Sequence, residues 1–319
     1  MGDRAKIEWT ETPWNPIVGC SVVSPGCTNC YAMRFVGHRL DGYPKTPHYA
    51  GTTQRGKADP VWTGKLALAP EKMLLLPLGW KRPRMICAVS MGDLFHESVP
   101  DEWIDKVFAV MALARQHTFQ VLTKRAERMR QYMTQLQNEP ARDTIQRMVA
   151  SIQRHPLPQF WAMTLPRPNV WLGVSVEDQR RADERIPYLL ETPAAVRFIC
   201  AEPLIGPIDF ANHLGGVPLH WIIVGGETGA GARPMRPDWV RSIRDQCQAS
   251  NVPFFFKQWG EWQSWPGGIV VRGSDTSTLK VIDPEWTVSR VGKRAAGRLL
   301  DGREHNGMPE GRALISPHR

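Results

Sequence analysis

Short, wholly apolar runs recur along this chain, and most of them are followed by a stretch with helical spacing. Apolar residues that do not alternate with polar ones are typical of parallel strands buried on both faces. We therefore predict six such strands, at Met85–Val89, Phe119–Leu122, Val170–Val176, Val196–Ala201, Trp221–Val224 and Pro253–Phe256. Helices are expected at Trp103–Arg115, Ala126–Gln137, Gln179–Glu191 and Asp238–Ser250.

Polar residues cluster directly after these strands. In a parallel βα barrel the carboxyl ends of the strands share one rim, where active sites lie. The pattern predicts an α/β fold, a TIM-barrel-like and partial parallel βα barrel, with a doubly wound open sheet as the alternative. We expect eight polar side chains to converge at the rim: Asp93, Thr123, Lys124, Ser175, Glu177, Glu202, Glu227 and Lys257.

Two regions lack the alternation of predicted strands and helices. Residues from about 38 to 78 are rich in Gly, Pro, Thr and Lys, and we interpret them as an excursion from the barrel. Residues 263–319 contain no clear βα unit. We predict a barrel domain over 1–262 that carries a cysteine loop near its start, followed by an appended C-terminal lobe or tail over 263–319.

The charge of the chain suits an anionic partner. Lys and Arg together number 40 against 31 Asp and Glu, a net charge of +9, which is compatible with binding nucleic acid and also common in enzymes that bind none. The segment Met1–Lys6 lacks the apolar region of a secretory signal, and no apolar run approaches the roughly 18 residues needed to span a bilayer. We therefore expect a cytoplasmic protein with no membrane partner.

Three of the six cysteines, Cys20, Cys27 and Cys30, fall within eleven residues. Pro25-Gly26 predicts a turn before the second of them. Thiolates this close in sequence can hold one metal centre, and thiolates suit zinc or an iron–sulfur cluster. A structural zinc site requires four protein ligands. Three cysteines instead match a four-iron cluster with one open iron, which can bind a small-molecule cofactor. Cys87 and Cys200 lie in apolar runs and are interpreted as core residues.

The cysteine segment also carries a resemblance. Asn15–Ala32, with its GC-x6-C-x2-CYA core, resembles the signature of a largely uncharacterised phage and bacterial family known for a three-Cys motif. The similarity extends to SMGDLFHE, VLTKR, LGVSVED, EPL, VGGETG, FFFKQWGEW and GKRAAGRLLDG, and so covers nearly the whole chain.

That resemblance implies membership of the radical S-adenosylmethionine (radical-SAM) enzymes, hence a barrel of radical-SAM type. Cys20, Cys27 and Cys30 would hold a [4Fe–4S] cluster that cleaves S-adenosylmethionine to a 5′-deoxyadenosyl radical. The usual spacing in that superfamily is C-x3-C-x2-C, whereas the first gap here is six and Asn29 stands where an aromatic residue is usual. A nucleic acid or nucleotide is the expected substrate, and the family's name also implies a partner protein.

The same resemblance suggests roles for the rim. Asp93 would hold the cofactor's amino group, and Ser175 and Glu177 its ribose or carboxylate; each carboxylate could instead cap a helix. Gly225, Gly226 and Glu227 resemble a cofactor-binding GGE signature but follow a different strand, where the two glycines could bring backbone close to a ligand or form a simple turn.

Lys124, Glu202 and Lys257 are candidates for substrate contact or acid–base work. A ring of salt bridges at the barrel mouth is the structural alternative for these three residues. Two other functions remain open from the sequence. The first is a zinc-binding, non-enzymatic protein that interacts with nucleic acid. The second is a metal-independent hydrolase that uses Glu202, Glu227 or Asp93.

Overall fold

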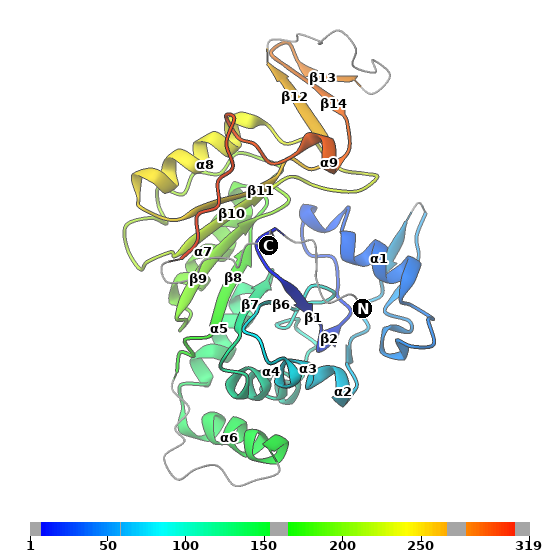
Figure 1. Ribbon diagram of the computed structural model, residues 1–319, viewed down its shortest axis with the longest axis vertical. Helices are drawn as coiled ribbons and strands as arrows, with labels where there is room; N and C mark the ends of the chain where they lie inside the picture. The colour runs from blue at the N-terminus through cyan, green and yellow to red at the C-terminus, as the bar shows by residue number, and fades with distance from the viewer. Residues whose placement is uncertain (1–7, 58, 154–164, 267–278, 310–319) are drawn as a thin grey trace.

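A curled, seven-stranded parallel sheet forms the centre of the computed structural model, which describes residues 8–57, 59–153, 165–266 and 279–309 (Figure 1). The strands lie side by side in chain order, β1-β6-β7-β8-β9-β10-β11. They are β1 (Thr12–Trp14), β6 (Met85–Ala88), β7 (Thr118–Thr123), β8 (Val170–Ser175), β9 (Val196–Ala201), β10 (Trp221–Gly225) and β11 (Phe254–Gln258). A doubly wound sheet reverses its strand order part-way. The sequential order here, with β1 and β11 at the two edges, confirms the predicted partial barrel.

The helices that follow individual strands cover the outer face of the sheet (Figure 1). They are α4 (Asp101–Leu113), α5 (Ala126–Gln135), α7 (Gln179–Glu191) and α8 (Pro237–Ala249). All four lie where the sequence predicts helices. The neighbouring α6 (Glu139–Gln153), which packs on α4, was not expected.

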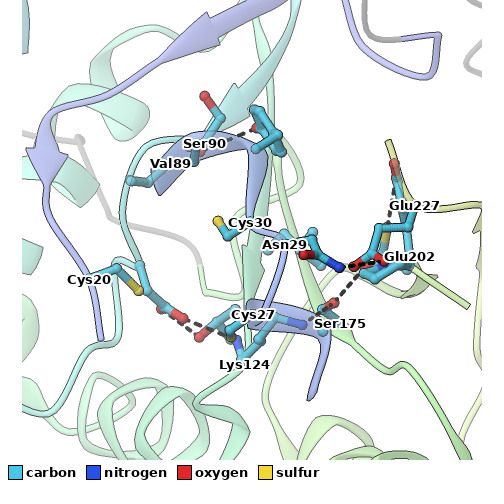
Figure 2. Close-up of a pocket in the computed structure, with 18 of the residues that line it drawn as sticks. Cys20, Cys27, Asn29, Cys30, Val89, Ser90, Lys124, Ser175, Glu202 and Glu227 are labelled. Carbon is cyan, nitrogen blue, oxygen red and sulfur yellow. Dashed lines mark hydrogen bonds between the residues drawn. The ribbon is translucent and has the colours of Figure 1, made fainter. Parts of the chain in front are cut away.

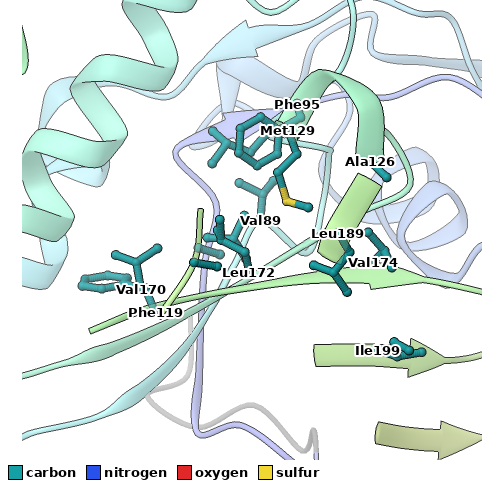
Figure 3. Packing of buried hydrophobic residues seen from close by; sticks show 14 of the residues in the cluster. Val89, Phe95, Phe119, Ala126, Met129, Val170, Leu172, Val174, Leu189 and Ile199 are labelled. Carbon is teal, nitrogen blue, oxygen red and sulfur yellow. The ribbon is translucent and has the colours of Figure 1, made fainter. Parts of the chain in front are cut away.

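Alternate residues of each strand enter two different cores. On the outer face, strand residues such as Phe119, Leu172 and Ile199 pack against Met129 of α5 and Leu189 of α7 (Figure 3). On the concave face, nine buried residues form a separate cluster with five aromatic side chains among them: Trp9, Met85, Cys87, Trp171, Phe198, Cys200, Trp221, Ile223 and Phe255. Burial on both faces explains why the strands are apolar throughout.

The strand β1 is the one member of the sheet that sequence patterning misses. It has three residues, one of them a proline, and pairs in parallel with β6 through Thr12, Pro13 and Trp14. A strand this short shows no periodicity, and proline is tolerated because β1 lies at an edge of the sheet. Its position is important because the cysteine segment begins only a few residues after it.

Short elements flank the cysteine segment and form a small layer at the mouth of the barrel (Figure 1). They are β2 (Ile17–Val18), η1 (Pro25–Cys27), α1 (Tyr31–Arg39), η2 (Pro47–Tyr49), β3 (Thr53–Arg55), β4 (Pro60–Trp62) and β5 (Ala67–Leu68). The two helical turns that follow, α2 (Glu71–Leu74) and α3 (Leu76–Gly79), lie beside α4 instead. Residues of this layer, among them Val18, Met33 and Trp62, form a third small core.

Beyond β11 the chain forms a separate three-stranded antiparallel sheet in the order β12-β14-β13, followed by one helical turn, α9. Their bounds are β12 (Trp262–Pro266), β13 (Leu279–Asp283), β14 (Trp286–Arg290) and α9 (Lys293–Ala296). The division into a barrel over 1–262 and a lobe over 263–319 remains our proposal. Met1–Lys6 and the last ten residues lie outside the described residues. Within the described ranges, no helix combines the length and the apolar character required for a membrane crossing.

Candidate metal and cofactor site

The three clustered cysteines lie on one loop at the mouth of the barrel. This loop, residues 19–30, runs from the end of β2 to the start of α1, so that Cys27 closes the turn η1 and Cys30 directly precedes α1. All three side chains line one cavity of about 390 Å³ between the loop and the concave face of the sheet. Figure 2 shows them along one side of this cavity, with Glu202 and Glu227 on the other.

The cavity wall contains most of the residues singled out from the sequence. Besides the three cysteines, eight of the residues predicted at the rim or for the cofactor line it: Asp93, Thr123, Lys124, Ser175, Glu202, Gly226, Glu227 and Lys257. Glu177 and Gly225 are buried immediately behind the wall, where Glu177 contacts Lys124 and Gly225 lies beside Glu202. The convergence of the rim residues was expected, because the carboxyl ends of parallel strands meet at one edge.

Glu177 attaches the cysteine loop to the end of β8. It is fully buried, and its Oε1 accepts a 2.6 Å hydrogen bond from Ser24 Oγ as well as a contact from Lys124 Nζ. Its Oε2 accepts from Arg185 at 3.1 Å. Burial acts to raise the pKa of Glu177, but the charges of Lys124 and Arg185 outweigh it and hold the pKa below its ordinary value. The carboxylate is therefore ionised at neutral pH.

Gly26 fits against the same carboxylate. A Cβ atom at this position would lie closer than 3.0 Å to the Glu177 side chain, a distance that real Cβ atoms essentially never show. The turn before Cys27 thus packs directly on a buried charge, and only glycine leaves room for it.

Arg125 attaches the loop to the end of β7. Its Nη1 donates to Cys20 Sγ at 3.4 Å and to Asp93 Oδ2 at 3.1 Å, while its Nη2 donates to the Ser21 hydroxyl at 2.8 Å. The side chain is only 4% exposed and also forms an ion pair with Glu97. The guanidinium group of Arg125 therefore links the candidate metal ligand Cys20 to Asp93, and it also donates to the Ser21 carbonyl of the loop at 3.1 Å.

Both carboxylate oxygens of Asp93 accept hydrogen bonds from neighbouring residues at the rim. Its Oδ1 accepts from Thr123 Oγ1 at 2.6 Å, and its Oδ2 accepts from the Lys124 backbone N–H and from Arg125, each at 3.1 Å. These contacts place the carboxylate between the ends of β6 and β7, within the cavity wall.

Glu227 attaches the loop to the end of β10. Arg233 binds both of its carboxylate oxygens, at 2.6 and 2.8 Å, and Asn29 Nδ2 donates to Oε2 at 3.0 Å. Arg233 also donates to the Pro25 carbonyl at 2.9 Å. Asn29, which stands where an aromatic residue was expected from the resemblance, thus contacts the opposite side of the barrel mouth.

Lys257 and Glu202 form an ion pair within the cavity, from the ends of β11 and β9. Burial acts to lower the pKa of Lys257, but the charge of Glu202 overrides it and raises the pKa above its ordinary value. The thiol of Cys200 lies 3.8 Å from Glu202 Oε2, and burial raises its pKa strongly. Lys257 is therefore a fixed cation at neutral pH, and Cys200 is a neutral thiol.

Lys124 provides a second cation in the cavity. Its Nζ donates to Ser175 Oγ at 3.0 Å and contacts Glu177, and Ser175 donates in turn to the Glu202 carbonyl at 3.2 Å. The rim is thus a connected set of charges and hydrogen bonds. It contains the salt bridges that were considered as the structural alternative.

Two thiols of the loop, Cys20 and Cys30, resist ionisation in this setting. Burial raises the pKa of Cys20 to about 12, although Arg125 opposes that rise, and burial also raises the pKa of Cys30. Within the described ranges, no group of three or more His, Cys, Asp or Glu side chains lies close enough to hold one metal ion.

Sequence reasoning missed several residues of the site. Tyr31 lies in the cavity wall, and Arg125 and Arg233 hold the loop. Arg125 could have been found, because it directly follows Lys124 after the strand β7. Arg233 lies in a segment without a strand signal, so nothing local identifies it. Trp9 and Lys293, the latter in the GKRAAGRLLDG stretch, also line the cavity.

Comparison with known proteins assigns the chain to a family. Residues 4–309 match the family described as protein of unknown function DUF5131. The chain belongs to that family. The three-Cys-motif resemblance is a separate prediction that this match does not address.

The search of curated proteins found no match. Among solved structures, spore photoproduct lyase complexed with dinucleoside spore photoproduct is similar at a TM-score of 0.40 and 9% identity, over 91% of this chain and 71% of that one. A mutant of the same lyase with bound AdoMet and the dinucleoside matches at a TM-score of 0.38 and 8% identity, over 87% and 67%.

Proposed function

We propose that this protein is a radical-SAM-like enzyme whose cysteine loop holds a [4Fe–4S] cluster. The observation that carries the proposal is the position of Cys20, Cys27 and Cys30 in the wall of a cavity of about 390 Å³. A closed structural zinc site is filled by its own four ligands and needs no such space. Three thiols beside a cavity are the donors expected for a cluster that leaves one iron open to a cofactor.

The donors present, three thiols on one loop, suit a four-iron cluster and not a single metal ion. Thiolates are the ligands of iron–sulfur clusters, and Arg125 is placed to donate to the sulfur of Cys20. When bound, the cluster would supply the electron that cleaves S-adenosylmethionine to a 5′-deoxyadenosyl radical. The protein's contribution is to orient the reactants and to exclude water.

The cavity cations would bind the charged parts of the cofactor. Lys124 and Lys257 stand at separate places in the wall, and each is paired with a carboxylate. Because Lys257 stays protonated, it would serve as an electrostatic contact for a carboxylate or phosphate and not as a general base. Ser175 would add a hydroxyl group on the same side.

Asp93, Glu177 and Glu227 would act mainly through the loop. Each of these carboxylates already accepts at least three hydrogen bonds or ion pairs from protein groups. We therefore propose that Glu177 and Glu227 fix the position of the cysteine loop relative to the strand ends, and that Asp93 orients Arg125. Gly226 would keep the end of β10 close to the end of β11.

The proposed substrate is a nucleic acid or nucleotide, supported by the net charge of +9. A partner protein, as the three-Cys resemblance implies, and a cytoplasmic location remain parts of this proposal.

The decisive experiment is anaerobic purification followed by quantification of iron, sulfide and zinc. We expect about four irons and four sulfides per chain, lost in Cys27→Ala. Cys247→Ala is the matched control, since this cysteine lies on the buried face of α8 and does not line the cavity. One zinc per chain without sulfide would exclude the proposal and support the zinc-binding alternative. Full hydrolytic activity in the metal-free protein would support the alternative of a metal-independent hydrolase.

A further inference from the structure

The outer face of α1 carries an unusual set of exposed side chains. Tyr31 is 51% exposed and Phe35 is 47% exposed, although large aromatic residues are mostly buried elsewhere in the protein. The two are four residues apart, so they lie on the same side of the helix. Arg39, also exposed, continues the same row one turn further. The row thus combines two ring faces with one cation.

This row leads directly into the mouth of the cavity. Tyr31 lines the cavity, and together with Thr228 it also lines a shallow hollow next to it. We call this hollow the α1 groove, and the residues that line it are Tyr31, Arg34, Phe35, His38, Arg39, Thr228 and Gly229. A molecule lying along the groove would therefore reach the cavity at Tyr31.

The groove is positive. Asp59 is shared by Arg34, at 2.5 Å, and by His38, at 3.7 Å, so one carboxylate serves two basic groups. Arg39 forms no ion pair with any described residue. Behind the groove residue Gly229, Arg290 donates to the Gly229 carbonyl at 2.6 Å and adds a cation near the groove without lining it.

We propose that the α1 groove binds single-stranded nucleic acid and presents one nucleotide to the cavity. The proposal rests on the proposed function for its purpose, since it names the substrate class of the same site. Aromatic faces stack on unpaired bases, and Arg side chains neutralise the phosphates between them. Bases in a duplex are stacked on one another and offer no free face to Tyr31 or Phe35.

The size of the cavity supports a strand that crosses its mouth. About 390 Å³ is near the lower end of the range for sites that enclose one small molecule. A polymer therefore has to lie outside the cavity, and the exposed row on α1 is the surface that continues from the mouth. A splayed nucleotide at Tyr31 would lie at the mouth, facing the cofactor proposed to occupy the cavity.

The test is fluorescence anisotropy with fluorescein-labelled 12-residue oligonucleotides, using the anaerobically purified full-length protein. The probes are single-stranded DNA, single-stranded RNA and a DNA duplex, each measured at several salt concentrations. We expect one of the single strands to bind more tightly than the duplex. Phe35→Ala should weaken that binding by about five-fold or more, the loss of one stacking contact. Arg39→Ala should reduce the slope of log affinity against log salt by about one phosphate contact.

A control variant removes a charge elsewhere. Arg180 on α7 has a side chain that is 78% exposed, and it lines neither the cavity nor the α1 groove, so Arg180→Ala should leave the affinity unchanged. Equal affinity of wild type, Phe35→Ala and Arg39→Ala would overturn the proposal, as would tighter binding of the duplex. A dimer that Phe35→Ala converts to a monomer, without any effect on oligonucleotide binding, would instead assign the groove to a second copy of the chain.

The two proposals fail in different ways. Loss of iron in Cys27→Ala with unchanged oligonucleotide binding would leave the groove intact as a binding surface. A full cluster content together with no oligonucleotide binding at low salt would overturn the proposal that the α1 groove binds nucleic acid. The cluster proposal would remain, with a small molecule as the substrate.

Discussion

Glu177 accepts a 2.6 Å hydrogen bond from Ser24, although 153 residues separate them in the sequence. The contact joins the end of β8 to the turn that carries Cys27. Two cations, Lys124 and Arg185, compensate the buried carboxylate. The group that we first considered as a cofactor ligand is thus also a structural link between the cysteine loop and the sheet, and this link can be tested by its dependence on pH.

Glu177→Gln should destabilise the protein by about 3 kcal/mol at pH 7, because it leaves Lys124 and Arg185 without their buried counter-charge. The folded protein holds the pKa of Glu177 below its ordinary value of 4.5, so the stabilisation is complete above pH 4.5 and is lost as the pH falls through the folded pKa. Urea unfolding followed by Trp fluorescence should therefore show a difference between wild type and variant that shrinks below pH 4.5. A difference of the same size at pH 7 and pH 3 would contradict this account.

Gly26→Ala should reduce the iron bound per chain by about half or more. The added Cβ atom would overlap the Glu177 side chain, so either the loop or the carboxylate has to move. Gly216→Ala is a matched control, because a Cβ atom there meets nothing within 4 Å. Iron analysis after anaerobic purification gives the measurement. Equal iron in the two variants would show that the packing of this turn does not position the cysteines.

The sequence predicted the sheet well because burial on both faces makes each central strand continuously apolar. For the same reason it placed Lys124, Glu202 and Lys257 at one rim. It could not show which groups pair across that rim. Asn29 and Glu227 are 198 residues apart, and Arg125 and Cys20 are 105 apart, so their contacts depend on the curvature of the sheet and have no local signal. The strand β1 is too short for any periodicity.

Glu202→Gln should lower the pKa of Lys257. In the folded protein burial favours the neutral amine, and the charge of Glu202 is the main effect that opposes it. At pH 8 the variant should therefore contain a larger fraction of neutral Lys257, which reacts several-fold faster with an acylating reagent. Mass spectrometry of peptides can compare this lysine with the exposed Lys280 in the same sample. An unchanged ratio of labelling would mean that Glu202 does not control the charge of Lys257.

Trp221→Ala should be the most damaging of these substitutions to stability. Trp221 is fully buried at the centre of the concave core, with its ring edge-on to Trp9, Trp171 and Phe255 at centroid distances of 5.9–6.1 Å. Removal of a buried Trp ring typically costs about 3–5 kcal/mol. Because Trp9 forms part of the cavity floor and packs on this ring, the same change should also reduce the binding of any ligand in the cavity.

Trp221→Phe separates the ring from its polar atom. Phenylalanine keeps most of the packing but loses the 2.7 Å hydrogen bond from Trp221 Nε1 to the Gly307 carbonyl, at a cost of about 1–3 kcal/mol for the acceptor left unsatisfied. We therefore expect the order wild type, Trp221→Phe, Trp221→Ala in the midpoint of urea unfolding. If Trp221→Phe were as unstable as Trp221→Ala, the link to the C-terminal segment at Gly307, and not the aromatic packing beneath the cavity, would be the main contribution of this residue.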